Sequence, residues 1–161
     1  MLGSTYTDQT CSIARSLEVV GERWTLLIIR DTFLGIRRFE DIQRDLGIAR
    51  NVLTARLEHL LEHDVLERRQ YQDRPARFEY FLTEKGLGLW PVIHSLMSWG
   101  DEFAPSPGGR PTISTHRGCG GELNADRVCQ ACGELVSSPR QSEAIAGPGA
   151  AEGHPLLSKA G

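Results

Sequence analysis

The sequence predicts a mainly α-helical domain with one β-hairpin, followed by a second, smaller hairpin that contains cysteines. Within the first hundred residues, apolar side chains recur at helical spacing in four consecutive segments. Two strand-like runs then flank the turn-forming residues Asp73 and Pro75. Residues 116–134 read HRGCGGELNADRVCQACGE and repeat a short motif of two metal-ligand side chains followed by glycine.

The composition sets limits on the kind of protein. A chain of 161 residues has room for one domain and a small appendage. Its 40% hydrophobic and 24% charged residues are ordinary for a globular protein, and the net charge of −3 means that any basic patch must be local. The N-terminus does not resemble a signal peptide, and no apolar run approaches the roughly 18 residues of a membrane helix. Because Cys11 stands far from the other three cysteines, we expect no disulfide framework and a cytoplasmic location.

The first three helices are each predicted by an apolar stripe that ends at a glycine. The stripes are Ile13, Leu17 and Val20; Trp24, Leu27, Ile28 and Leu34; and Phe39, Ile42 and Leu46. Gly21, Gly35 and Gly47 follow these stripes, and Gly47 stands where helices commonly end in the left-handed conformation. Thr10-Cys11-Ser12 can open the first helix.

The fourth helix has the clearest pattern. Its apolar side chains fall within about 100° of arc, the width of a stripe that faces a core. They are Leu53, Leu57, Leu60 and Leu61. Only Gly47-Ile48-Ala49 separates this helix from the third, which is the turn length expected of a helix-turn-helix.

A hairpin and a final helix complete the first domain. LERRQY and RFEYFL flank QDRPA, so Arg74 and Arg77 are expected at the hairpin tip. The next helix is expected to begin at Thr83-Glu84, to kink at Pro91 and to run through Phe103. Its apolar face covers nearly half of the circumference, which is wide enough to pack against both its own core and a second partner. The element order predicts a winged helix-turn-helix over residues 1–104.

The remainder of the chain divides by composition. PSPGGRPTIST predicts a linker over residues 105–115. Residues 116–136 contain the cysteine motifs and are expected to form a zinc-ribbon-like β-hairpin appendix. Residues 137–161 lack periodicity and are dominated by Ala, Gly, Ser and Pro, which predicts a disordered tail.

Two local clusters of arginine point to DNA. Residues 37–56 and 67–77 each have a net charge of +2 within a chain of net charge −3. The winged fold places its second motif helix in the major groove and its hairpin near an adjacent groove, and the arginine fork suits phosphates and guanine edges. In the alternative interpretation, the arginines are a solvated surface and the domain is a protein-interaction module without sequence-specific DNA binding. Motifs typical of enzymes are missing from the sequence, so we do not expect an enzyme.

Residues 11–100 resemble the HxlR-type transcriptional regulators, which are related to the MarR winged-helix proteins. The resemblance rests on three segments: CSIARSLEVVGERWTLLIIRDTFLGIRRFEDIQRDLGIARNVLTARLEHLLEHDVLERR, RPARFEYFLTEKG and PVIHSLMSWG. It implies a homodimer, with its first and last helices in the dimer interface, that acts at a palindromic operator. We expect a repressor that an effector or thiol oxidation can regulate.

The resemblance also implies roles for individual side chains. It implies DNA contacts at the start of the third helix, on the fourth helix, which would read the major groove (the reading helix), and on the hairpin (the wing). The residues are Arg37, Arg38, Arg50, Asn51, Thr54, Arg56, Arg74 and Arg77. Asn51 and Thr54 are expected to face bases, and the arginines to hold phosphates. Ala49 departs from the family pattern, in which many members have Ser or Thr at this position, and it cannot cap the reading helix.

Some HxlR-type proteins sense quinones, aldehydes or hypochlorite through a cysteine near the start of the first helix, and Cys11 matches that position. A helix N-terminus lowers the pKa of a thiol and favours the reactive thiolate. The alternative is that Cys11 is a small buried residue at the dimer interface. Trp24, Trp90, Met97 and Trp99 can likewise line an effector pocket or belong to the core and dimer packing.

The motifs at residues 116–134 predict a structural zinc site. Their four ligands are His116, Cys119, Cys129 and Cys132. Zinc takes four such ligands in a tetrahedron, and the glycine after each pair permits the tight turn. A zinc deaminase would need a Glu two residues after the histidine, and a thioredoxin-like pair would need a βαβ context, neither of which is present. An unmetallated flexible segment and a redox role of Cys129 and Cys132 remain alternatives.

Overall fold

The computed structural model of the chain describes Tyr6 and residues 10–157. The chain divides into two compact units, Met1–Gly86 and Leu87–Gly161. Among the described residues, no helix has both the length and the apolar character that crossing a bilayer requires.

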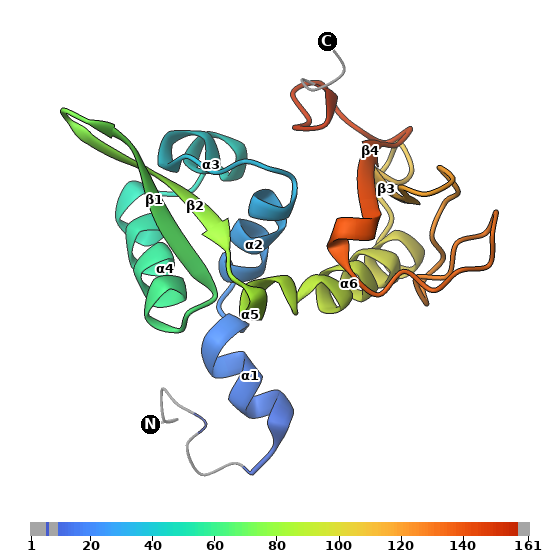
Figure 1. The fold of residues 1–161 in the computed structure, drawn as a ribbon, viewed down its shortest axis with the longest axis horizontal. Coiled ribbons are helices and arrows are strands. Elements are labelled where there is room, and N and C mark those ends of the chain that lie inside the picture. Colours follow the sequence, from blue (N-terminus) through green and yellow to red (C-terminus); the bar gives the residue numbers. More distant parts are fainter. Residues whose placement is uncertain (1–5, 7–9, 158–161) are drawn as a thin grey trace. The chain divides into compact units, whose positions relative to one another are not determined.

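The first unit has the predicted order of four helices and a hairpin (Figure 1). Its elements are α1 (Ser12–Val20), α2 (Thr25–Phe33), α3 (Phe39–Leu46), α4 (Arg50–Glu62), β1 (Leu66–Asp73) and β2 (Ala76–Leu82). Helix α2 packs against α3 and β2, and α4 packs against β1. Figure 1 shows the β1–β2 hairpin extending beyond the helices as a wing. The predicted winged helix-turn-helix is therefore confirmed.

The core of the first unit is built from the apolar stripes that the sequence shows. Its most deeply buried side chains are Ile28, Ile29, Ile42, Leu53, Leu57, Leu60 and Val65, each at most 1% exposed. Full burial of a side chain of this size contributes about 1.5–3 kcal/mol, so these residues are the main source of stability in this unit.

One carboxylate lies inside this apolar core. Asp31 on α2 is 0% exposed, and its Oδ1 accepts a 2.6 Å hydrogen bond from Nη2 of Arg30. The same Nη2 also donates to Oδ2 of Asp45 on α3, at 2.9 Å. Oδ2 of Asp31 has no hydrogen-bond partner in the described part of the chain. Burial therefore raises the pKa of Asp31 to about 7, although the positive charge of Arg30 opposes the shift.

The wing is a two-stranded antiparallel sheet with one irregularity. Leu66 pairs with Leu82 at its base and Asp73 with Ala76 at its tip, and the register shifts between Gln70 and Gln72. The segment before α3 lies along the free edge of β2. There the backbone N–H of Tyr80 donates to the carbonyl of Arg37 at 2.8 Å, and Arg38 forms an isolated bridge with Glu79.

The second unit contains helix α6 (Trp90–Phe103), strands β3 (Thr112–His116) and β4 (Ser142–Ala146), and the short 3₁₀ helix η1 (Pro139–Gln141). Strands β3 and β4 are antiparallel, with Thr112 opposite Ala146 and His116 opposite Ser142. Both strands lie in segments that the sequence analysis assigned to a linker and a disordered tail. Thr112-Ile113-Ser114-Thr115 is rich in β-branched residues, and its partner strand supplies the ladder that a linker would lack.

The expected helix from Thr83 to Phe103 is two helices in the structure. A short helix, α5 (Glu84–Leu87), precedes α6, and Pro91 lies in the first turn of α6. Proline is tolerated there because the first-turn N–H groups of a helix have no intrahelical acceptor. Pro91 thus helps to begin a helix and does not kink one, which corrects the prediction.

Candidate nucleic-acid interface and metal centre

The turn between α3 and α4 has the three-residue length that the sequence predicts. Gly47 ends α3 with φ +60°, a left-handed conformation that a residue with a side chain rarely adopts. Ile48 is 4% exposed and anchors the turn in the core. Ala49 then has the extended backbone of a helix N-cap, with φ −65° and ψ 139°, and has no side-chain oxygen to cap α4.

Helix α4 separates its core face from its exposed face. Leu53, Leu57 and Leu60 are buried, whereas Arg50, Asn51 and Thr54 are exposed. The guanidinium of Arg50 lies 4.6 Å from the ring centroid of Phe39, and Thr54 Oγ1 donates to the carbonyl of Arg50 at 2.9 Å. The structure thus brings three of the predicted DNA contacts together on the first turns of α4.

Arg56 does not lie with these three residues. At 100° per residue its side chain points about 200° away from that of Thr54, next to the buried stripe of α4. It is half-buried, and its Nε lies 3.9 Å from Oε2 of Glu22 in the segment between α1 and α2. A phosphate contact by Arg56 would therefore require this long ion pair to open.

Arg37 and Arg38 lie where the chain enters α3, beside the middle of β2. Nε of Arg38 donates to Oε1 of Glu79 at 2.9 Å, and its guanidinium lies 4.5 Å from the ring centroid of Tyr71. Arg37 is exposed and lies 4.5 Å from the ring centroid of Phe81. Glu79 already neutralises part of the positive charge of Arg38. We therefore expect Arg38 to attract a phosphate less strongly than Arg37 does.

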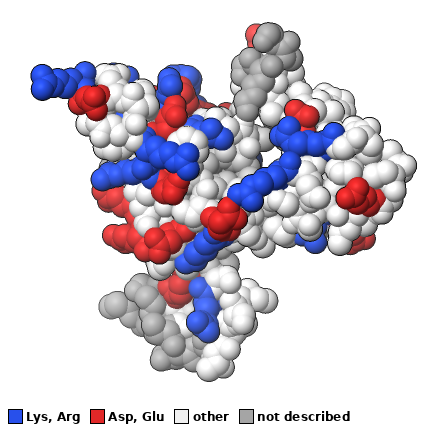
Figure 2. Space-filling view, in the orientation of Figure 1, with Lys and Arg blue, Asp and Glu red and all other residues white. Residues whose placement is uncertain are grey.

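Arg74 and Arg77 lie at the tip of the wing, as the hairpin pattern predicts. Both are exposed, and Arg77 pairs in register with Gln72. Among the residues that the structure describes, neither guanidinium has an ion-pair partner. Figure 2 shows basic side chains extending from the wing tip with an acidic patch beside them. Both guanidinium groups are therefore accessible to a phosphate.

Cys11 is the N-cap residue of α1, with its thiol exposed. The backbone N–H groups of Ala14 and Ile13 lower the pKa of this thiol. The thiol is exposed in a single copy of the chain, so the alternative of burial at a dimer interface would require a second copy to cover it. The lowered pKa increases the fraction of reactive thiolate near neutral pH.

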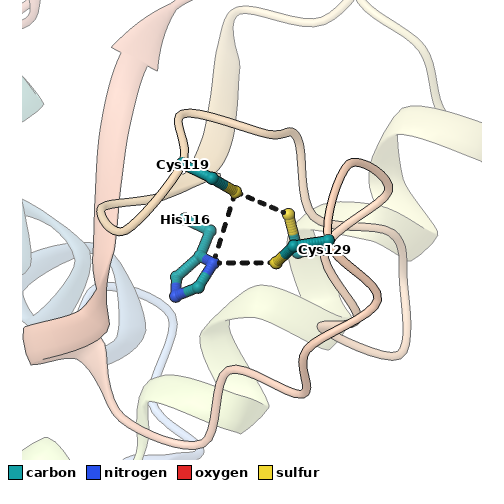
Figure 3. A group of neighbouring side chains, drawn as sticks. His116, Cys119 and Cys129 are labelled. Carbon is teal, nitrogen blue, oxygen red and sulfur yellow. Dashed lines mark hydrogen bonds between the residues drawn. The ribbon is translucent and has the colours of Figure 1, made fainter.

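Four side chains in the second unit form one cluster (Figure 3). They are the predicted metal ligands His116, Cys119, Cys129 and Cys132, whose ligand atoms all lie within 4.8 Å of one another. Nδ1 of His116 lies 3.5 Å from Sγ of Cys119 and 3.4 Å from Sγ of Cys132. Sγ of Cys119 lies 3.4 Å from Sγ of Cys129. Figure 3 shows the three labelled side chains, one of them at the end of β3, pointing toward one another.

The backbone around the cluster favours negative charge on sulfur. Strand β3 ends at His116. Cys129 and Cys132 lie in a tight turn in which the N–H of Gly133 donates to the carbonyl of Cys129 at 2.8 Å. The N–H of Cys132 lowers the pKa of Cys129 to about 6, and burial opposes this shift. A thiolate is the form of cysteine that binds metals.

Sequence reasoning missed one residue of this site. Oε2 of Glu134 lies 3.8 Å from Nε2 of His116, the ring nitrogen that faces away from the cysteines. Nothing in the local spacing singles out Glu134, because its place beside the imidazole depends on how the two loops come together.

Comparisons with known proteins find relatives of the helix-turn-helix. A family model described as HxlR-like helix-turn-helix matches residues 19–107. An HTH-type transcriptional regulator of Mycobacterium tuberculosis is 45% identical over 138 residues, which are 86% of this chain and 87% of that protein. A match of that length in a chain of 161 residues includes residues 116–132, whichever end it leaves out.

Two solved structures resemble the fold. The protein PA1607 has a TM-score of 0.66 and 33% sequence identity, and the match covers 81% of this chain and 92% of that one. The redox regulator HypR in its reduced form has a TM-score of 0.53 and 26% identity, and the match covers 57% of this chain and 92% of that one.

Proposed function

Because the chain belongs to the HxlR-like helix-turn-helix family, we propose that it is a DNA-binding transcriptional regulator that represses from a palindromic operator as a homodimer. The observation that carries this proposal is the exposed first half of α4, which follows a three-residue turn and presents Arg50, Asn51 and Thr54. In a helix-turn-helix these positions enter the major groove.

The polar groups on this surface match the chemistry of DNA. The carboxamide of Asn51 can donate to and accept from an adenine edge at once, which gives sequence preference. Arg37, Arg74 and Arg77 are exposed and can contact phosphates on either side of the groove. The first turn of α4 has no acidic residue, so its N–H groups and positive dipole end also favour a phosphate.

Homodimerisation is proposed from two helices that leave apolar side chains exposed. On α1, Ile13 is 71% and Leu17 is 42% exposed. On α6 the exposed apolar residues are Val92, Leu96, Trp99 and Phe103. Contiguous exposed apolar surface on a monomer marks an interaction site, and the two-fold symmetry of a dimer requires a palindromic operator.

We also propose Cys11 as the residue through which an oxidant or electrophile regulates DNA binding. The similarity to the redox regulator HypR, the exposed thiol and the lowered pKa of Cys11 favour this role. The thiolate sulfur would add to a ring carbon of a quinone, with a proton taken up from solvent, or would attack the chlorine of hypochlorous acid and release hydroxide. The sulfenyl chloride formed in the second case would hydrolyse to a sulfenic acid and chloride. Either product would alter the spacing of the two reading helices in a dimer. Replacing Cys11 by serine should abolish the response to quinones and hypochlorite, and an unchanged response would contradict this role.

The experiment that tests the main proposal is a fluorescence-anisotropy titration of the full chain at several salt concentrations. Two duplexes are compared, the region upstream of its own gene and a shuffled control. We expect a preference of roughly a thousandfold for the native duplex. If a dimer contacts about six to eight phosphates, the log–log salt slope should be roughly −5 to −7.

Matched variants make this test specific to α4. Asn51→Ala should lower affinity for the native duplex by about 1–3 kcal/mol and leave binding to the shuffled duplex unchanged. Glu62→Ala, at the far end of the same helix, should change neither affinity. Equal and weak binding of the wild-type chain to both duplexes would contradict the proposal and favour a protein-interaction module.

A further inference from the structure

We propose that His116, Cys119, Cys129 and Cys132 bind one Zn²⁺ ion that stabilises the fold of residues 116–136, called the C-terminal hairpin below. The family match over residues 19–107 ends before these four residues, so the proposal does not rest on the proposed regulator function. The proposal rests on the distances between the ligand atoms, the glycines around them and the small apolar core beside them.

The distances fit a tetrahedral ion. With Zn–S near 2.3 Å and Zn–N near 2.0 Å, tetrahedral angles place two sulfurs about 3.8 Å apart and a sulfur and a nitrogen about 3.5 Å apart. Nδ1 of His116 lies 3.5 Å from Sγ of Cys119 and 3.4 Å from Sγ of Cys132, and the two sulfurs of Cys119 and Cys129 are 3.4 Å apart. These three separations differ from the tetrahedral values by at most about 0.4 Å. All four ligand atoms lie within 4.8 Å of one another, so a zinc ion requires movements of about 1 Å or less.

The backbone of both loops is shaped around the ligand atoms. Gly120 and Gly133 each follow a ligand cysteine and have φ values of +72° and +74°, a conformation that glycine adopts without strain. A Cβ atom on Gly121 would lie 2.5 Å from Sγ of Cys129, and one on Gly118 would lie 3.1 Å from Cε1 of His116. Larger residues at 118 and 121 would push the ligands apart.

The hairpin has too little apolar core to hold the four ligands in place unaided. Within residues 117–136 only Leu123, Cys129 and Val136 are buried apolar residues. The backbone pairing there consists of isolated bridges, such as the one between Leu123 and Cys129. Small units of this kind usually need a metal or a disulfide, and a structural zinc contributes its binding free energy to folding.

The donor set specifies both the metal and its role. Three thiolates and one imidazole in a tetrahedron suit Zn²⁺, and four protein ligands leave no open position for a substrate. Nδ1 of His116 is the ring nitrogen close to the sulfurs and would be the ligand atom. Oε2 of Glu134 lies 3.8 Å from Nε2, which is beyond hydrogen-bond distance. A shift of about half an ångström on metal binding would let Glu134 accept the Nε2 proton and act as a positioning residue for the imidazole.

The first test is the metal content of the full chain purified without chelators. Elemental analysis should find about one zinc per chain in the wild type. Cys119→Ser and Cys132→Ser should lose most of it, whereas Cys11→Ser, outside the site, should retain it. Iron in place of zinc, or no stoichiometric metal, would overturn the proposal.

Reversible reconstitution covers the case in which a cysteine variant fails to fold. Wild-type chain stripped with a chelator should take up Co²⁺ with the intense visible absorption of a tetrahedral thiolate site, and Zn²⁺ should displace it. Weak octahedral absorption would overturn the proposal. Glu134→Gln should lower zinc affinity about tenfold, while Glu152→Gln should not. These readouts measure metal alone, so they succeed or fail independently of DNA binding.

Discussion

Replacing Ala49 by serine is expected to stabilise the first unit, because α4 begins without a side-chain cap. Ala49 already has the extended backbone of an N-cap residue, so serine requires no change of conformation. The side chain is exposed, and the added hydroxyl meets no steric barrier from the core. Its oxygen can accept a hydrogen bond from the N–H of Asn51 or Val52 in the first turn.

The size of the effect follows from known capping energies. A serine cap in place of alanine contributes about 1 kcal/mol, within a range of roughly 0.5–2 kcal/mol. Ala55 provides a matched control, because it is exposed in the interior of the same helix. Serine there has lower helix propensity than alanine, so Ala55→Ser should destabilise by about 0.5 kcal/mol. Two chemically identical substitutions six residues apart should therefore have opposite signs.

The assay is urea denaturation followed by far-UV circular dichroism, supported by thermal unfolding. For a unit of this size, 1 kcal/mol corresponds to a shift in Tm of about 4–8 °C. If Ala49→Ser has no effect or destabilises while Ala55→Ser behaves as expected, α4 does not begin at Arg50. The placement of Asn51 and Thr54 in the first two turns would then be wrong as well.

Three further predictions concern other parts of the chain. Burial raises the pKa of Asp31 to about 7, so unfolding releases its proton between about pH 4 and pH 7. The free energy of unfolding of the wild type should therefore fall as the pH rises through that window. Denaturation curves at pH 5 and pH 8 should show this fall for the wild type and not for Asp31→Asn. Arg74→Ala combined with Arg77→Ala removes four arginines from a dimer, so it should reduce the magnitude of the salt slope of DNA binding by roughly 3–4 without changing sequence preference, whereas Arg44→Ala should leave the slope unchanged. Leu96→Glu should convert a dimer to a monomer in sedimentation experiments, and a persistent dimer would contradict a role for α6 in the interface.

The helices and the wing were predictable because their determinants are local. Leu53, Leu57 and Leu60 repeat at helical spacing and are all buried, and Gly47 adopts the left-handed conformation expected at the end of α3. Strands β3 and β4 were not predictable in the same way. Each has only five residues, and the register that joins Thr112 to Ala146 spans more than thirty positions. Their pairing depends on that long-range contact, which composition and periodicity do not encode.

The candidate sites also combine features that local sequence predicts with features that depend on contacts between distant segments. The spacing of His116, Cys119, Cys129 and Cys132 predicts a ligand set, and the structure brings the four side chains together. Glu134 and the pairing of Arg38 with Glu79 depend on contacts between segments and could not be read from the sequence. Helical spacing alone predicts that Arg56 lies away from Thr54 on α4. The resemblance to the family nevertheless implied that Arg56 contacts DNA.

The two units reach their stability by different physical means, and this makes their roles separable. The first unit buries a set of large aliphatic side chains, including Ile28 and Leu53, and contains the residues proposed to read DNA. The second has few buried apolar residues around its hairpin and contains both the proposed zinc ligands and α6. Chelation should therefore unfold the hairpin and leave the core of the first unit intact. A loss of operator affinity on chelation would then point to α6 and the dimer, because all of the residues proposed to read DNA lie in the first unit.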